Sequence, residues 1–329
     1  MSDGLAPTRA EAAPGADPGL DLCVDLGRGL VLPNVVGLAS GTAGFGFELE
    51  RLIDLDRLGC LYTKGTTLQP RSGNAPPRVA ETAAGMLNSI GLQNPGVEHV
   101  AREYAPRFAH WRMPVVVNVA GAAAEDYVAC ARRLDGVVGV SGLELNISCP
   151  NIAGGLDFGR DPAAAARLVE AVRGVTRLPV LVKLSPNVTD IAAVARSVEA
   201  AGADAISAVN TYLGMKIHLG SRRPVLPGTG LGGISGPAIK PLALAAVAAV
   251  RSAVSVPVIG VGGIATAGDA LEFFVAGADA VQVGTATFAD PAAALQVLDG
   301  CVAYAQRHRL ARLTELRWVR APVTVRDEA

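Results

Sequence analysis

Aromatic residues are scarce in this chain of 329 residues, where they make up 4% of the sequence, and charged residues reach only 18%. The formal net charge is -1 and no block of like charges occurs, which argues against nucleic acid or an anionic membrane surface as the main partner. No apolar run reaches membrane-spanning length without a Gly, a Pro or a charge. The sequence therefore predicts a soluble, cytoplasmic protein that needs neither nucleic acid nor a membrane.

Cysteines and histidines also lack the spacing of metal ligands or of a disulfide framework. The four histidines are widely scattered. The cysteines are odd in number, five in all, and no two of them form a CxxC pair. The cysteines are Cys23, Cys60, Cys130, Cys149 and Cys301. We therefore predict no protein-bound metal.

The first residues, Met1 to Asp17, are rich in Ala, Pro and Gly. Such a composition cannot bury enough apolar surface to become ordered, and it lacks the basic start and apolar centre of a secretory signal. We predict a disordered leader at residues 1–19, one large domain at 20–309 and a C-terminal tail at 310–329.

Short β-branched apolar runs alternate with longer Ala-rich amphipathic segments throughout the large domain. Eight strands are predicted, at Asn34–Ala39, Cys60–Thr63, Pro114–Val119, Gly142–Asn146, Val180–Leu184, Ala205–Val209, Val258–Val261 and Ala280–Val283. Helices are predicted at Ala124–Leu134, Pro162–Val175, Ile191–Ala201, Ala238–Ser252 and Ala267–Ala276. Asp161 and Asp190 precede two of these helices as N-cap residues.

Strand–helix alternation implies parallel pairing, and eight such units imply an α/β fold of the closed (β/α)8 TIM barrel type. A doubly wound open sheet is the alternative. It would place a glycine-rich fingerprint after the first strand, whereas the pair Gly262-Gly263 follows the seventh. The barrel is therefore the predicted fold.

A polar residue or a glycine lies at or just past the carboxyl end of every predicted strand. Because the chemistry of such barrels lies at the carboxyl ends of the strands, we expect these residues to converge on a polar ligand. They are Ser40, Lys64, Asn118, Asn146, Lys183, Asn210, Gly262-Gly263 and Gly284-Thr285. The two glycine-containing ends fit a phosphate cradle, although tight turns alone would also need glycine.

Cys149 and two lysines carry further chemistry. Cys149 follows the fourth strand within Asn146–Asn151, where a thiol suits proton transfer, and burial as a small hydrophobe is the alternative. Lys64 and Lys183 end apolar strands, where a lysine either meets an anion or extends to solvent.

Longer motifs occur in a specific order. They are Leu38–Gly46, Thr63–Thr67, Pro77–Thr82, Gly85–Gly96, Asn146–Asn151, Val182–Asn187, Val209–Thr211 and Ile234–Pro241. By these motifs the chain, from about Leu20 to Ala305, resembles the dihydroorotate dehydrogenase family, and within it the class 1, NAD-linked B-type catalytic subunit. The resemblance implies oxidation of (S)-dihydroorotate to orotate in de novo pyrimidine (UMP) biosynthesis, with one FMN per chain at the carboxyl face of the barrel.

The resemblance also implies roles for single residues. Cys149 would be the base at ring carbon 5 of the substrate, while FMN N5 accepts hydride from ring carbon 6. Substrate-binding roles fall on Lys64, Asn88, Ser89, Ile90, Gly91, Leu92, Asn146, Asn210 and Thr211. FMN-binding roles fall on Ser40, Lys64, Gly65, Asn118, Asn146, Lys183, Val209, Gly236, Gly262, Gly263, Gly284 and Thr285. The substrate ring alternates N–H donors and C=O acceptors, and an asparagine amide offers both.

The resemblance further implies a homodimer, or a heterotetramer with a subunit that carries FAD and a 2Fe–2S iron–sulfur cluster and passes electrons to NAD. Three alternatives stay open: a dihydropyrimidine dehydrogenase-like enzyme acting on dihydrouracil or dihydrothymine, the fumarate-using homodimeric class, and a non-flavin barrel such as a sugar-phosphate lyase or a binding-only paralogue. The membrane-linked, quinone-reducing class is disfavoured because it normally has serine as its base. The segment Gly214–Leu231 either contacts a partner or is a solvated loop.

Overall fold

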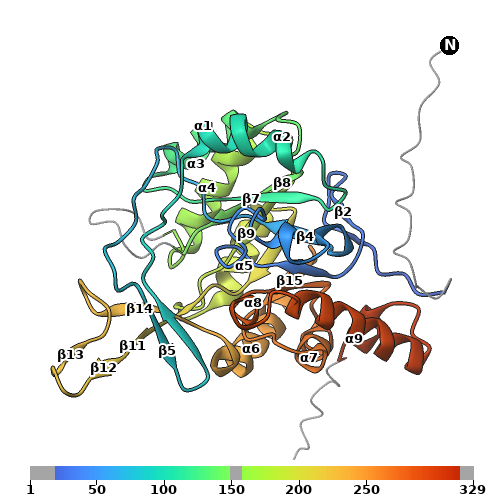
Figure 1. The fold of residues 1–329 in the computed structure, drawn as a ribbon. Coiled ribbons are helices and arrows are strands. Elements are labelled where there is room, and N and C mark those ends of the chain that lie inside the picture. Colours follow the sequence, from blue (N-terminus) through green and yellow to red (C-terminus); the bar gives the residue numbers. More distant parts are fainter. Residues whose placement is uncertain (1–18, 149–157, 319–329) are drawn as a thin grey trace, which may run out of the picture.

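The computed structural model describes residues 19–148 and 158–318, and its centre is a closed barrel of eight parallel strands (Figure 1). The barrel strands are β3 (Val36–Leu38), β4 (Cys60–Tyr62), β7 (Val115–Val119), β8 (Gly142–Asn146), β9 (Val180–Lys183), β10 (Ala205–Ala208), β15 (Val258–Val261) and β16 (Ala280–Val283). They follow one another around the barrel in chain order, and β16 pairs with β3 to close it. The predicted TIM barrel is confirmed, with every strand within two residues of its predicted bounds.

Helices cover the outside of the barrel (Figure 1). They are α1 (Val97–His99), a π-helical turn (Val100–Tyr104), α2 (Ala105–Phe108), α3 (Ala124–Leu134), α4 (Pro162–Arg173), α5 (Ile191–Ala200), α6 (Lys240–Arg251), α7 (Ala267–Ala276), α8 (Ala286–Ala289) and α9 (Ala293–His308). The N-cap prediction is confirmed: Asp161 accepts from the Ala163 N–H at 2.9 Å, and Asp190 accepts from the Ala193 N–H at 3.0 Å. Among the described residues, every helix is too short or too polar to cross a membrane.

Apolar side chains fill the space on both sides of the barrel strands, and all residues of β9, β15 and β16 are buried. Such two-sided burial explains why these strands read as continuous apolar runs. The hairpin of β1 (Val24–Asp25) and β2 (Val31–Leu32) closes the amino end of the barrel. Its Leu26, Leu30 and Leu32 pack against inner residues such as Tyr62 and Ile259.

A second, antiparallel sheet stands at the carboxyl end of the barrel and was not predicted. It combines β5 (Val79–Thr82) and β6 (Gly85–Asn88), inserted after β4, with β11 (Tyr212–Met215) and β14 (Leu231–Ser235), inserted after β10. Between β11 and β14, the short hairpin β12 (Ile217–His218) and β13 (Arg223–Pro224) forms the tip of an arm that projects from the body (Figure 1). The first crossover, between β3 and β4, contains two 3-10 turns in place of an α-helix, at Leu49–Arg51 and Leu55–Arg57.

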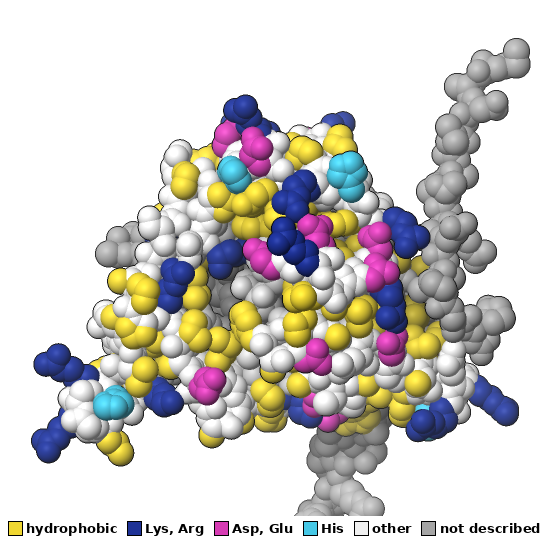
Figure 2. All heavy atoms as spheres, viewed as in Figure 1, with side chains coloured by type: hydrophobic (Ala, Val, Ile, Leu, Met, Phe, Trp, Pro, Cys, Tyr) yellow, Lys and Arg dark blue, Asp and Glu magenta, His cyan; other side chains and the backbone are white. Residues whose placement is uncertain are grey.

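The arm is unusual in its exposed surface. Leu213, Met215, Ile217 and Leu219 are all exposed, the last by 85%. Lysine, arginine and histidine side chains lie beside these apolar groups at the tip (Figure 2). Exposed apolar groups of this density are typical of interaction surfaces.

Candidate active site

The carboxyl ends of the eight barrel strands meet at one rim because the strands are parallel and the barrel is closed. Asn118 lies within β7, Asn146 and Lys183 are the last residues of β8 and β9, and Asn210 follows β10 by two positions. The described part of the predicted site therefore shares one end of the barrel. Cys149, the predicted base, lies outside the described residues.

Two asparagines and a serine form a hydrogen-bonded cluster on this rim. Asn146 Oδ1 accepts from Asn210 Nδ2 at 3.1 Å and from the Ser148 hydroxyl at 2.8 Å. Asn210 Nδ2 also approaches Ser148 Oγ to 2.5 Å, and the Tyr127 hydroxyl donates to the Asn146 carbonyl at 2.7 Å. The cluster is only partly buried, so its amide groups stay available to a ligand. Sequence reasoning missed Ser148, although it directly precedes Cys149.

Thr211 is held beside this cluster by backbone contacts. Its N–H donates to Asn210 Oδ1 at 2.8 Å, and its carbonyl accepts from Asn187 Nδ2 at 3.1 Å. Asn187 Oδ1 in turn accepts from the Leu213 N–H at 2.9 Å, at the start of the arm. Asn187 is thus a structural link between the rim and the arm, a role that its place in a motif did not reveal.

Asn118 is completely buried, and its two amide atoms have different surroundings. Its Nδ2 donates to the Glu144 carboxylate at 2.6 Å, whereas its Oδ1 has no hydrogen-bond partner among the described residues. Buried polar atoms are nearly always paired, so an orphaned acceptor at a barrel rim points to a missing ligand. Glu144 was not predicted, although a carboxylate within an apolar strand is costly unless it is satisfied.

The two rim lysines differ in burial. Lys183 is 4% exposed, and no described residue forms an ion pair or hydrogen bond with its ammonium. Lys64 is half-buried; burial first, and then the charge of Arg78, lower the pKa of its ammonium. Holding two cations in these positions is unfavourable without an anion, so both lysines fit an anionic ligand.

The predicted substrate segment, Asn88–Leu92, runs from the inserted sheet toward the rim. Asn88 Nδ2 donates to the Gly233 carbonyl at 3.1 Å, which joins β6 to β14. A side-chain carbon added at Gly65 would lie 3.3 Å from Leu92 and 3.2 Å from Asn118 Oδ1, so the segment reaches the end of β4. The structure therefore brings Leu92 to the rim.

Ser89 and Asn94 form hydrogen bonds that hold the segment in place. Ser89 accepts from Asn74 Nδ2 through both its carbonyl, at 3.0 Å, and its hydroxyl, at 2.9 Å. Asn94 Oδ1 accepts from the N–H groups of Thr67 at 3.1 Å and Gly96 at 2.8 Å. Ser89 is therefore held by Asn74, and Asn94 is a buried anchor that sequence reasoning missed.

Glycines let the loops at the other side of the rim pack closely. Gly236 and Gly263 have φ of +94° and +75°, in the region that favours glycine. A side-chain carbon at Gly263 would lie 2.9 Å from the Gly236 carbonyl, so even alanine would separate these two loops. The close packing is a structural reason for both glycines.

Backbone donors nevertheless remain at these loops. No described group accepts a hydrogen bond from the N–H of Gly262, Gly263, Gly284 or Thr285. The Thr285 hydroxyl, which donates to Ser235 Oγ at 2.8 Å, ties the loop after β16 to the end of β14. Unpaired N–H groups on glycine-rich turns are typical of phosphate cradles.

The remaining predicted positions are simpler. Ser40, which follows β3, is partly exposed, and Val209 is buried, its N–H donating to the Val261 carbonyl at 2.9 Å. The Ile90 carbonyl accepts from the Asn74 N–H at 3.0 Å, and Gly91 has a φ of +73°. Among residues 19–148 and 158–318, no group of three or more His, Cys, Asp or Glu has the arrangement of a metal site.

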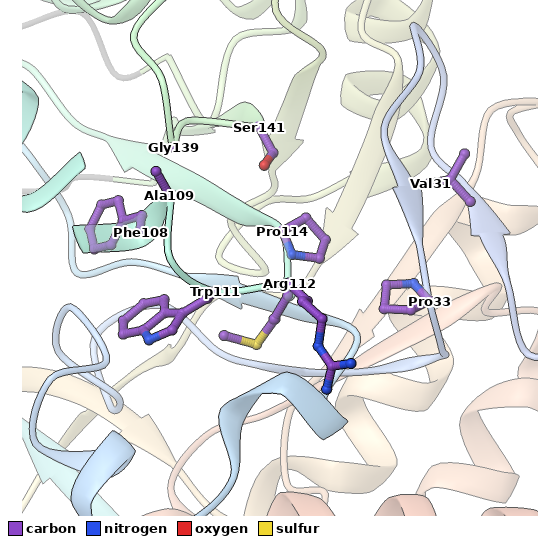
Figure 3. A pocket seen from close by; sticks show the side chains of 10 residues that line it. Val31, Pro33, Phe108, Ala109, Trp111, Arg112, Pro114, Gly139 and Ser141 are labelled. Carbon is purple, nitrogen blue, oxygen red and sulfur yellow. The ribbon is translucent and has the colours of Figure 1, made fainter. Parts of the chain in front are cut away.

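A separate pocket of about 240 Å³ lies at the opposite, amino end of the strands (Figure 3). Pro33, Pro114 and Ser141 line it just before β3, β7 and β8, and Trp111 and Arg112 complete it. Its Ser141 hydroxyl accepts from the Val115 N–H at 3.2 Å. It contains none of the predicted site residues.

Known proteins resemble the chain over nearly the whole described region. A family model described as dihydroorotate dehydrogenase matches residues 22–303. A relative from Desulforamulus reducens, named dihydroorotate dehydrogenase B (NAD(+)), catalytic subunit, is 51% identical over 298 residues, or 90% of this chain and 97% of the relative. The protein of that name from Porphyromonas gingivalis is 50% identical over 294 residues (89% and 95%). That from Listeria monocytogenes is 52% identical over 264 residues (80% and 86%).

Proposed function

Because the chain belongs to the dihydroorotate dehydrogenase family, we propose that it oxidises dihydroorotate to orotate in pyrimidine biosynthesis, as the catalytic subunit of an NAD-linked enzyme. It is an oxidoreductase on a TIM barrel. The observation that carries the substrate assignment is the cluster of Asn146, Ser148 and Asn210, in which Ser148 directly precedes Cys149 in the sequence. The names of the relatives favour neither the dihydropyrimidine nor the fumarate-using alternative.

FMN is the cofactor we propose for this flavoprotein family, and three observations fit it. The free N–H groups of Gly262, Gly263, Gly284 and Thr285 suit its phosphate. Asn118 Oδ1 offers a buried acceptor, and Lys183 offers a buried cation that would stabilise negative charge on a reduced ring. When bound, FMN supplies the acceptor for the hydride from ring carbon 6.

The asparagine cluster would orient the substrate ring. Asn146 and Asn210 each present a planar amide on a partly buried rim, so ring N–H and C=O groups can be paired in one orientation. Lys64 would bind the carboxylate. Burial lowers the pKa of its ammonium, and a bound anion would oppose that effect by stabilising the charged form. Leu92 and its segment would exclude water from this side.

Cys149 would remove the proton at ring carbon 5. A free thiol has a pKa of about 8.5, and a lysine ammonium beside a thiol would raise the thiolate fraction at neutral pH. Its neighbour Ser148 is held by Asn146 at 2.8 Å, which restricts the chain immediately before the thiol. Positioned proton transfer of this kind contributes on the order of 100- to 10,000-fold.

We also propose that electrons leave through a partner subunit carrying FAD and a 2Fe–2S cluster, and that two copies of this chain form the centre of the assembly. The names of the relatives, which specify a catalytic subunit and NAD(+), support a second subunit. The exposed apolar side chains of the arm support contacts with another chain.

Anaerobic reduction of the purified protein tests the substrate assignment. Addition of dihydroorotate is expected to bleach the flavin absorbance within the mixing time, whereas dihydrouracil at the same concentration leaves it unchanged. Bleaching by dihydrouracil alone would favour the dihydropyrimidine alternative. A protein that cannot be loaded with flavin would overturn the proposed cofactor.

A further inference from the structure

A buried carboxylate lies inside the barrel beneath the rim. Glu144, the third residue of β8, is fully buried. Its Oε2 accepts from Asn118 Nδ2 at 2.6 Å, and its Oε1 accepts from the Ser207 hydroxyl at 2.7 Å and from Gln282 Nε2 at 3.1 Å. The four residues come from β7, β8, β10 and β16, so the network spans the barrel interior.

Stability alone does not account for Glu144. Burying a carboxylate costs several kcal/mol even when hydrogen bonds compensate, and an apolar residue of similar volume would be at least as stable. Its hydrogen-bond partners in the described chain are all neutral side chains. Barrel interiors are usually filled with branched apolar residues, as the neighbouring inner residues Val116 and Ile259 are here.

The carboxylate determines which way the Asn118 amide faces. Glu144 Oε1 accepts from Ser207 and Gln282, and a carboxylate has no hydrogen to donate, so the atom of Asn118 that meets Oε2 has to be the nitrogen. The carbonyl oxygen of Asn118 must then point away from the network. It is buried and has no described partner, and it lies 3.2 Å from the position of a side-chain carbon at Gly65 on the rim.

We propose that Glu144 is a positioning residue for the cofactor, which holds the Asn118 amide so that only its oxygen faces the flavin site. The oxygen then accepts from an N–H or O–H group of FMN. The proposal rests on FMN as the ligand of the proposed function. A negative charge on Glu144 also opposes the negative charge that a flavin gains on reduction, opposite in sign to Lys183 on the adjacent strand.

Titration of the apoprotein with FMN, followed by quenching of flavin fluorescence, tests the proposal. Glu144→Gln removes the acceptor-only partner, so the Asn118 amide can turn over; FMN affinity is expected to fall about tenfold. Asn118→Asp, which places two carboxylates in contact, is expected to weaken binding at least as much. The double variant Asn118→Asp/Glu144→Gln restores a donor–acceptor pair with oxygen toward the flavin, and affinity is expected within about threefold of wild type.

Ser207→Ala is the matched control. It removes one donor to Glu144 from the same interior but leaves the Asn118 contact in place, so FMN affinity is expected within about twofold of wild type. The midpoint potential of bound FMN gives a second reading, which a purely structural role would not change. It is expected to rise in Glu144→Gln, because a nearby negative charge is removed.

Three results would overturn the proposal: unchanged affinity and potential in Glu144→Gln, a double variant no better than the single ones, or a loss in Ser207→Ala equal to that in Glu144→Gln. If Glu144→Gln does not fold, the double variant and Asn118→Asp decide. Wild-type apoprotein that binds no FMN would instead overturn the cofactor assignment and this proposal with it. Normal binding by wild type with unaffected variants would overturn this proposal alone.

Discussion

The two ends of the barrel use polar residues in opposite ways. At the amino end, Asp204 accepts from the Val180 N–H at 2.8 Å and from Arg173 at 3.0 Å. At the carboxyl end, Asn118 Oδ1 and the Lys183 ammonium have no partner among the described residues. Asp204 finds its partners within the protein, whereas these two rim groups need a ligand, which matches the division of stability and activity in this fold.

The amino-end arrangement occurs twice. Asp279 repeats the geometry of Asp204, because it accepts from the Val258 N–H at 2.8 Å and pairs with Arg251 at 3.3 Å. Each aspartate directly precedes a barrel strand and receives the first N–H of the strand before it, and each arginine ends a helix. The same contact at two strands indicates a structural role for both aspartates. The cluster on the rim, in contrast, occurs once and leaves amide groups available to a ligand.

The largest effect is expected at the rim. Cys149→Ala should lower kcat for dihydroorotate by about 100- to 10,000-fold while FMN stays bound, because only proton removal is lost. In wild type, the rate should rise as the pH rises through the pKa of the Cys149 thiol, because the thiolate is the base. Steady-state kinetics with a dye acceptor, together with the flavin spectrum, measures both.

Cys301→Ala is the control for this substitution. Cys301 lies on α9, away from the rim, and burial raises the pKa of its thiol to about 12. Its removal should leave kcat unchanged. Equal turnover in Cys149→Ala and wild type would show that Cys149 is not the base.

Lys64→Met should separate binding from stability. Loss of a charge-assisted contact with the substrate carboxylate is expected to lower kcat/KM about 100-fold. The pKa of Lys64 is lowered in the fold, so its charged form destabilises the ligand-free protein below the unfolded pKa; the Tm without substrate should therefore stay the same or rise. A clear drop in Tm would mean that Lys64 has a structural partner.

Asp279→Asn should lower stability and leave activity unchanged, the reverse of the result expected for Lys64→Met. It weakens the pairing with Arg251 and Arg317 and is expected to lower the free energy of unfolding by about 1–3 kcal/mol with kcat/KM unchanged. Asp299→Asn, which breaks an exposed ion pair with Arg57, should cost about 1 kcal/mol or less. Thermal unfolding of the three proteins, with activity measured in parallel, makes the comparison.

The smallest effect concerns pH at the amino end. The Thr176 hydroxyl and the Arg177 N–H, each at 2.8 Å, lower the pKa of Asp135. A lowered pKa stabilises the fold above the unfolded pKa, and this contribution is lost as the pH falls through the folded pKa. Asp135→Asn should remove about 1 kcal/mol or less at pH 7 and flatten the decline in Tm below about pH 4. An unaltered Tm profile from pH 3 to 7 would contradict this.

Strands were predictable because two-sided burial leaves a run of β-branched residues, and β8, β15 and β16 match their predicted bounds. The inserted sheet was not predictable, because β6 pairs with β14 across a long separation that periodicity does not encode. Rim residues could be inferred from their place after each strand. Glu144 could not, since its partners lie on three different strands and only the closed barrel brings them together.

The inserted sheet also determines how the chain could be divided. A cut between β8 and β9 would give two fragments with four barrel strands each, one carrying β5 and β6 and the other β11 and β14. Neither fragment would contain the whole inserted sheet, because Asn88 and Gly233, which join β6 to β14, would lie on different fragments. Catalytic activity of the mixed fragments would therefore show that the two halves had reassembled, so a split at this point suits a fragment-complementation assay.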